Sequence, residues 1–163
     1  MRLNKIGLYI IYLILTALIT SCDDTNKESS VPKSEKQAEH TDGGYQITNY
    51  YPFSLLDDPR NTIAIYLYNS EDSILIKYAP IFEKYGYSGN GESWAGHIEQ
   101  ILEQVDPELL KHIDFDPEGD AFFAYVDTKE NQLRIANILV PIFTDFNKLE
   151  KHLASANSER IWD

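Results

Sequence analysis

The stretch IFEKYGYSGNGESW, residues 81–94, joins two predicted helices through a glycine-rich loop. Before the loop, apolar residues recur at intervals of three and four over residues 74–85, which is the spacing of one helix face. Pro80 interrupts that pattern, so the first helix either begins near Pro80 or is kinked there. Three glycines at 86–91 suit a sharp turn that needs positive φ angles. Ser93 is a good N-cap for the second helix.

Two strands are predicted on the N-terminal side of this stretch. Residues 45–56 are rich in Tyr, Ile and Phe and are expected to form one strand. Residues 62–68 are dense in β-branched and aromatic side chains and predict a second. The turn composition of residues 58–61 between them indicates a hairpin.

Further elements are predicted on the C-terminal side. Asp106 and Pro107 indicate the start of a short helix, and residues 121–126 a third strand. The segment 133–140 is β-rich in composition, yet its spacing favours a helix that opens after Asp127 or Thr128 and ends near Pro141. Thr144 or Asp145 would then cap a last helix through Leu153. The expected fold is α+β, with a small antiparallel sheet packed against several short helices in a single domain, residues 45–163.

The N-terminus carries the pattern of a bacterial lipoprotein signal peptide. Residues 1–21 combine a short basic start with a nearly continuous apolar run, and Cys22 follows the small residue Ser21. We therefore expect cleavage before Cys22 and lipidation of its thiol, although an uncleaved membrane anchor is the alternative. Residues 22–44 are almost wholly polar and predict a flexible tether. The protein is thus expected to face the periplasm or the cell exterior, held at the membrane by its lipid.

The chain is strongly acidic. Removal of the two basic residues of the signal segment from 14 leaves 12 Lys and Arg against 26 Asp and Glu, or −14 for the mature chain. In residues 45–163 the corresponding numbers are 9 and 20, or −11. Such a surface repels nucleic acid and suits a basic partner, although acidic surfaces also simply maintain solubility. Cys22 is the single cysteine, so no intramolecular disulfide is expected.

No motif in the chain predicts a metal, a cofactor or catalysis. The glycine loop lacks the Gly-Lys-Ser/Thr of a phosphate-binding loop and is preceded by a helix rather than a strand. Residues 114–119 resemble the start of a calcium loop, but its twelfth position is Tyr125 instead of glutamate. Ser93 and His97 are four residues apart without a nucleophile elbow. The residues alone therefore leave an enzyme as the runner-up class of function.

Two segments resemble the immunity protein 51 family of bacterial polymorphic toxin systems. Residues 81–94 are similar to its helix, Gly-Tyr, Gly-Asn-Gly and Trp pattern, and residues 113–125 to its second motif, which pairs Asp-x-Glu with a short aromatic strand. The resemblance spans about residues 60–153, and Glu92 departs from it where an aromatic residue is expected. It implies an α+β domain that neutralises a cognate toxin by stoichiometric binding, without catalysis or a cofactor.

Aromatic residues and acids near these motifs are the candidate toxin-binding residues, because aromatic anchors dominate interface energies and acids attract a basic toxin. For Trp94 and Tyr87 the alternative is a place in the core, which we favour for Trp94. The alternative function is an envelope lipoprotein that binds a small ligand or acts as a hydrolase. The candidates are Tyr87, Asn90, Glu92, Trp94, Asp114, Asp116, Glu118 and Asp120.

Overall fold

The computed structural model describes residues 40–42, 44–67 and 74–161. Cys22, the predicted signal peptide and most of the predicted tether lie outside these residues. Across the described ranges, no helix has the length and apolar character needed to span a bilayer.

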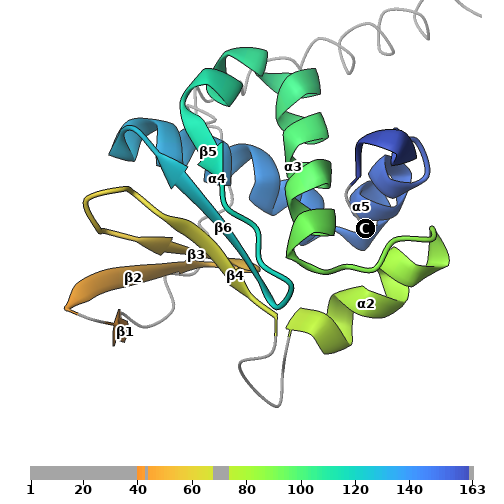
Figure 1. Cartoon of the computed structure of the whole chain (residues 1–163), viewed down its shortest axis with the longest axis horizontal. Helices are drawn as coiled ribbons and strands as arrows, with labels where there is room; N and C mark the ends of the chain where they lie inside the picture. The colour runs from red at the N-terminus through yellow and green to blue at the C-terminus, as the bar shows by residue number, and fades with distance from the viewer. Residues whose placement is uncertain (1–39, 43, 68–73, 162–163) are drawn as a thin grey trace, which may run out of the picture. The chain divides into compact units, whose positions relative to one another are not determined.

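The described strands form one antiparallel sheet in the order β1-β2-β3-β4-β6-β5 (Figure 1). The predicted hairpin joins β3 to β4. Residues 67–120 separate β4 from β6 in the chain, although the two strands are neighbours in the sheet. The strands are β1 (His40–Asp42), β2 (Tyr45–Tyr50), β3 (Phe53–Leu56), β4 (Ile63–Tyr66), β5 (Ile113–Phe115) and β6 (Ala121–Val126).

Two strand predictions differ from the structure. The single strand expected over residues 45–56 is two strands, because the chain turns at Tyr51 and Pro52 and a proline cannot donate a hydrogen bond to the ladder. The sheet also includes β1, which lies in the segment assigned to the tether. Its pairing with β2 uses backbone groups, which a polar composition does not reveal.

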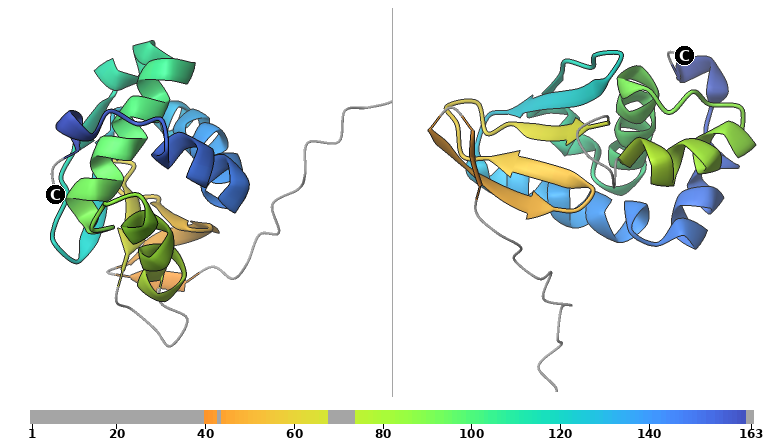
Figure 2. Two further views of the ribbon diagram at one scale, coloured as in Figure 1. Left: turned by 90° about the vertical axis from the view of Figure 1, so that its right-hand side faces the viewer. Right: turned by 90° about the horizontal axis from the view of Figure 1, so that it is seen from below.

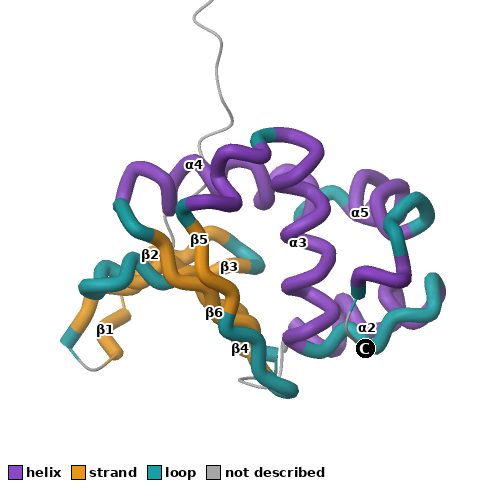
Figure 3. Tube along the Cα trace, turned by 45° about the horizontal axis from the view of Figure 1, so that its top comes forward, coloured by secondary structure: helices purple, strands orange, loops and turns teal. Residues whose placement is uncertain are grey.

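Four α-helices and two short 3₁₀ helices accompany the sheet in the described part of the chain (Figure 2). The phenyl ring of Phe53 on β3 contacts Trp94 of α3 and Phe143 of α4, so both helices pack on the same face of the sheet. Figure 3 shows the helices gathered beside the strands. The α+β prediction is confirmed. The helices are α2 (Ile74–Lys84), α3 (Gly91–Val105), η1 (Pro107–Lys111), α4 (Lys129–Phe143), α5 (Phe146–Leu153) and η2 (Ser158–Arg160).

Most helix predictions are confirmed, with one correction at a cap. The ambiguous segment 133–140 is helical within α4, which Thr128 caps, and Asp145 caps α5. Helix α2 begins before Pro80 and continues past it. Ser93 is not the N-cap of α3, because Asn90 takes that place and its side chain accepts a 2.8 Å hydrogen bond from the Ser93 backbone N–H.

Candidate interaction surface

The aromatic candidates from the glycine-rich stretch are buried. Trp94 is 0% exposed, stacks on Phe143 at 4.8 Å between ring centroids, and donates from Nε1 to the Gly89 carbonyl at 3.2 Å. Tyr87 is 7% exposed, and its ring centroid lies 4.4 Å from that of His97. Both residues therefore hold the loop against the core. The structure supports the alternative given for them in the sequence analysis, which is a place in the core.

The polar candidates in the same stretch are also engaged locally. Asn90 caps α3, as described above. Glu92 is half-buried, and its Oε2 is enclosed without a hydrogen-bond partner among the described residues. Neither side chain is fully exposed, unlike the anchor that the sequence analysis proposed at these positions.

Gly91 brings the two motifs of the resemblance together. A Cβ atom at this glycine would lie 2.1 Å from the carbonyl oxygens of both Glu118 and Ala121, closer than any side chain tolerates. The first turn of α3 thus seats directly on the backbone of the turn that leads into β6. The glycine-rich motif positions the second motif, and only a residue without a side chain permits that approach.

The four acidic candidates are exposed on the hairpin between β5 and β6, and we call them the acidic hairpin: Asp114, Asp116, Glu118 and Asp120. None of them forms an ion pair within the described ranges. Elsewhere in those ranges most basic residues are paired with carboxylates, namely Lys84, Lys111, Lys129, Arg134, Lys148 and Arg160. The negative charge of the acidic hairpin is therefore available to a partner.

Aromatic side chains lie next to the acidic hairpin on the face of the sheet opposite the helices, which we call the outer face. Asp114 is directly opposite Tyr125, whose hydroxyl donates a 2.7 Å hydrogen bond to Asp116. This bond raises the pKa of the Tyr125 hydroxyl, because ionisation would break it and place a second negative charge beside Asp116. Phe123 and Tyr66 form an edge-to-face pair, with centroids 5.7 Å apart. Aromatic rings beside solvent-exposed charge are typical of binding surfaces.

Arg60 extends this surface from the turn between β3 and β4. Its guanidinium carbon lies 3.6 Å from the centroid of the Tyr125 ring, which is a cation–π contact. Among the described arginines, Arg60 is the one without an ion pair to a carboxylate. The sequence analysis did not select Arg60 or Tyr125 as candidates. They are 65 residues apart in the chain, and although Tyr125 ends the second segment of the family resemblance, no local pattern connects it with Arg60.

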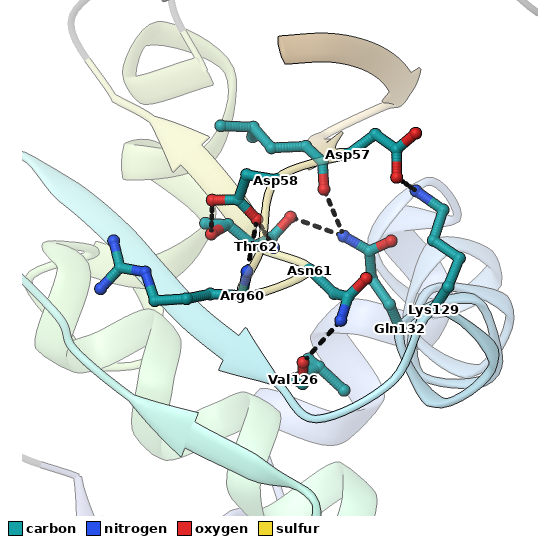
Figure 4. Close-up of polar contacts among 9 residues, drawn as sticks. Asp57, Asp58, Arg60, Asn61, Thr62, Val126, Lys129 and Gln132 are labelled. Atoms are coloured by element: carbon teal, nitrogen blue, oxygen red, sulfur yellow. Dashed lines mark hydrogen bonds and ion pairs between the residues drawn. The ribbon is translucent and has the colours of Figure 1, made fainter.

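A hydrogen-bond network fixes the turn that carries Arg60 (Figure 4). Asp58 accepts from the Thr62 hydroxyl at 2.7 Å and from the Arg60 backbone N–H at 3.2 Å. Asn61 adopts a positive φ of 48° and donates to the Val126 carbonyl at 3.0 Å. The buried amide of Gln132 on α4 donates to the Thr62 carbonyl at 2.8 Å. The position of Arg60 is thus set by β6 and α4 together.

A shallow hollow of about 420 Å³ opens at the start of β5. On its wall, Nδ1 of His112 lies 2.6 Å from a carboxylate oxygen of Asp127. Hydrogen bonds from Asn131 and His112 lower the pKa of Asp127. Charges of both signs line the hollow, which suits polar contacts with a partner better than an apolar ligand. Its lining residues include Arg60, Lys111, His112, Asp114, Tyr125 and Asp127.

The structure offers no access to the Ser93 and His97 pair. Both residues are 0% exposed, and each has a side-chain atom without a partner among the described residues, so they do not hydrogen-bond to each other. Instead, Nδ1 of His97 lies 3.2 Å from Nε2 of His152 on α5. Burial, and to a smaller extent repulsion from His152, lowers the pKa of His97 to about 3. In the described part of the chain, no three His, Cys, Asp or Glu side chains gather in a way that would hold a metal ion.

The comparisons with known proteins give one match. The family model described as Immunity protein 51 matches residues 53–158, which include β3, the Arg60 turn, the glycine-rich stretch and the acidic hairpin. No curated protein and no solved structure matches the chain. Immunity proteins neutralise toxins and are typically binders rather than enzymes, so the match supports the expectation that the protein is not an enzyme. This chain belongs to the immunity protein 51 family.

Proposed function

We propose that this protein is a lipid-anchored immunity protein that binds a basic toxin in a stoichiometric complex at the cell envelope. The binding surface is the outer face together with the acidic hairpin. The observation that carries this proposal is that the acidic hairpin has four exposed carboxylates without cationic partners in the described residues. Two of them, Asp114 and Asp116, lie beside Tyr125, whose ring also contacts Arg60.

The chemistry of the surface fits a protein partner. Exposed carboxylates accelerate encounter with a basic domain, and a rigid aromatic ring beside an arginine supplies the contacts that dominate interface energies. Tyr125 is held between Arg60 and Asp116, so little conformational freedom is lost when a partner packs on it. A partner that covers this surface would be neutralised by occlusion, which needs no catalysis.

The N-terminal sequence supports the location. Cys22 follows an apolar segment and a small residue, as lipidation requires, and the residues between Cys22 and β1 are numerous enough to separate the folded unit from the membrane. An acylated protein at the membrane would meet a toxin that enters or crosses the envelope. Lipidation can be tested by mass spectrometry of the mature protein, for which we expect acyl chains on an N-terminal Cys22 and an unmodified Cys22→Ala protein.

A protection assay tests the whole proposal. We expect the adjacent gene to encode the toxin, which is delivered from outside to cells that make the full chain, or residues 23–163 without a signal peptide. We expect the full chain alone to protect, and purified residues 23–163 to bind the toxin in a one-to-one complex. Equal protection by the cytoplasmic form would contradict an envelope site of action, and an absence of binding would contradict the immunity function.

A further inference from the structure

Strand β5 forms one end of the sheet in the described structure, and its outer edge has no neighbouring strand. In an antiparallel ladder, alternate residues direct both backbone polar groups to the same neighbour. The Asp127 N–H donates to the His112 carbonyl at 3.1 Å, and the Asp116 N–H donates to the Phe123 carbonyl at 2.9 Å. Residues 112, 114 and 116 therefore bond to β6.

The same alternation turns the backbone groups of Ile113 and Phe115 away from β6. The register places them opposite Val126 and Ala124, which are non-hydrogen-bonded positions. Each residue thus offers one N–H and one C=O at the open edge. These four groups can accommodate a short strand from another protein.

Side chains along the same edge define the sequence that such a strand needs. Opposite residues share a face of the sheet, so Ile113 and Phe115 lie on the core side with Val126 and Ala124. The ring of Phe115 lies 6.2 Å from that of Phe122. Asp114 lies on the outer face, exposed and without an ion pair in the described ranges. A strand beside β5 would therefore meet carboxylates on one face and half-buried apolar groups on the other.

Charge also decides which strands the edge rejects. A second copy of this chain would bring its own acids, since residues 45–163 carry −11, and like charges facing each other across a ladder are destabilising. A strand with basic residues at every second position would instead pair with Asp114 and Asp116. The edge is thus protected against self-association and open to a basic partner.

We infer that an extended segment of the toxin, with alternating basic and apolar residues, adds to β5 as an additional antiparallel or parallel strand. This inference rests on the proposed function and names the contact that the toxin makes. Backbone hydrogen bonds to Ile113 and Phe115 supply a sequence-tolerant part of the interface, while Asp114 and Asp116 select for positive charge.

Amide hydrogen exchange of the wild-type chain provides the first test, with the purified domain of the toxin encoded by the adjacent gene as the probe. The toxin should slow exchange at the Ile113 and Phe115 amides. The Asp114 amide is already bonded to β6 and should change much less. If the toxin binds but the Ile113 and Phe115 amides exchange as fast as before, the inference is wrong and the proposed function stands.

A matched pair of variants provides the second test. Phe115→Ala and Phe115→Pro both lose the ring that packs near Phe122, but only the proline variant loses the outward N–H. Asp114, which precedes this position, is in an extended strand, so its backbone tolerates a following proline. We expect toxin affinity to be about tenfold lower for Phe115→Pro than for Phe115→Ala, with thermal unfolding measured for both.

The remaining outcomes are also decisive. Equal affinities of the two folded variants would overturn strand addition at β5. If Phe115→Pro does not fold, the exchange pattern of the wild-type chain decides alone. A toxin domain that fails to bind the wild-type chain at all overturns the proposed function, and this inference fails with it.

Discussion

The glycine-rich stretch and the acidic hairpin both contribute to the family resemblance, but they occupy opposite environments. Trp94 and Tyr87 of the first are 0% and 7% exposed, whereas the four acids of the second are exposed. The more distinctive of the two sequences is thus the one that a partner cannot reach. The rare combination of glycines and tryptophan is required for close packing in the core, whereas common exposed acids can contact a partner.

The largest expected effect comes from Trp94→Ala. The indole packs against four aromatic rings and donates a hydrogen bond to Gly89, so its removal should lower the free energy of unfolding by about 3–5 kcal/mol. Urea denaturation measures this loss, and toxin affinity of the folded fraction should be unchanged. A Trp94→Ala protein of normal stability that no longer binds toxin would place Trp94 in the interface and remove the contrast between the two motifs.

Gly91→Ala tests the contact that joins the two regions. Its new methyl group must displace the backbone at Glu118 and Ala121, and we expect a loss of about 3 kcal/mol in the free energy of unfolding. Gly119 is the matched control, because a Cβ there meets nothing within 4 Å and its φ is not positive. Thermal unfolding of the two alanine variants should differ clearly. Similar unfolding midpoints would show that the backbone at Glu118 and Ala121 moves aside for the new methyl group at little cost.

The buried region should also respond to pH. Burial lowers the pKa of His97 to about 3 and lowers that of His152, whereas both rise to ordinary values near 6.5 on unfolding. Below pH 6.5 the unfolded state therefore binds protons that the folded state does not, and stability falls as pH decreases towards 3. For His97 alone the loss between pH 7 and pH 5 is about 2 kcal/mol. Denaturation at several pH values should show that the free energy of unfolding depends less steeply on pH in His97→Gln than in the wild-type protein. Equal slopes would mean that His97 titrates alike in both states.

The smallest expected effect on stability and the most specific effect on binding belong to Asp114→Lys. This exposed substitution should leave thermal unfolding nearly unchanged and weaken toxin binding about tenfold at low salt, with a smaller ratio at high salt. Glu83→Lys on α2 makes the same change in net charge away from the outer face. Titration calorimetry should separate the two. Equal weakening by both variants would indicate a general charge effect rather than a contact at the acidic hairpin.

The sequence was sufficient for the elements with long periodic patterns. Helix α4 was recognisable despite its β-rich composition because Leu133, Ala136 and Val140 keep helical spacing, and Thr128 caps it as expected. Strand β6 was recognisable from its aromatic run. The cap of α3 was misplaced by three residues because Asn90 and Ser93 are both good caps, and the decisive factor is the tertiary contact that admits Gly91 into the first turn.

Short and non-local features were out of reach. Strand β5 has three residues, too few to show alternation, and its acids looked like a loop. The contact of Arg60 with Tyr125 depends on the register between β4 and β6 and on the network around Asn61. No local pattern reports such a register. Sequence reasoning therefore found the acids of the surface but not the aromatic and arginine side chains that accompany them.

The seat of α3 on the acidic hairpin uses backbone carbonyls only, since Gly91 meets the main chain of Glu118 and Ala121. Replacement of an exposed side chain in this hairpin leaves those carbonyls in place. The charges that this hairpin displays can therefore be changed by substitution without rebuilding the junction beneath it.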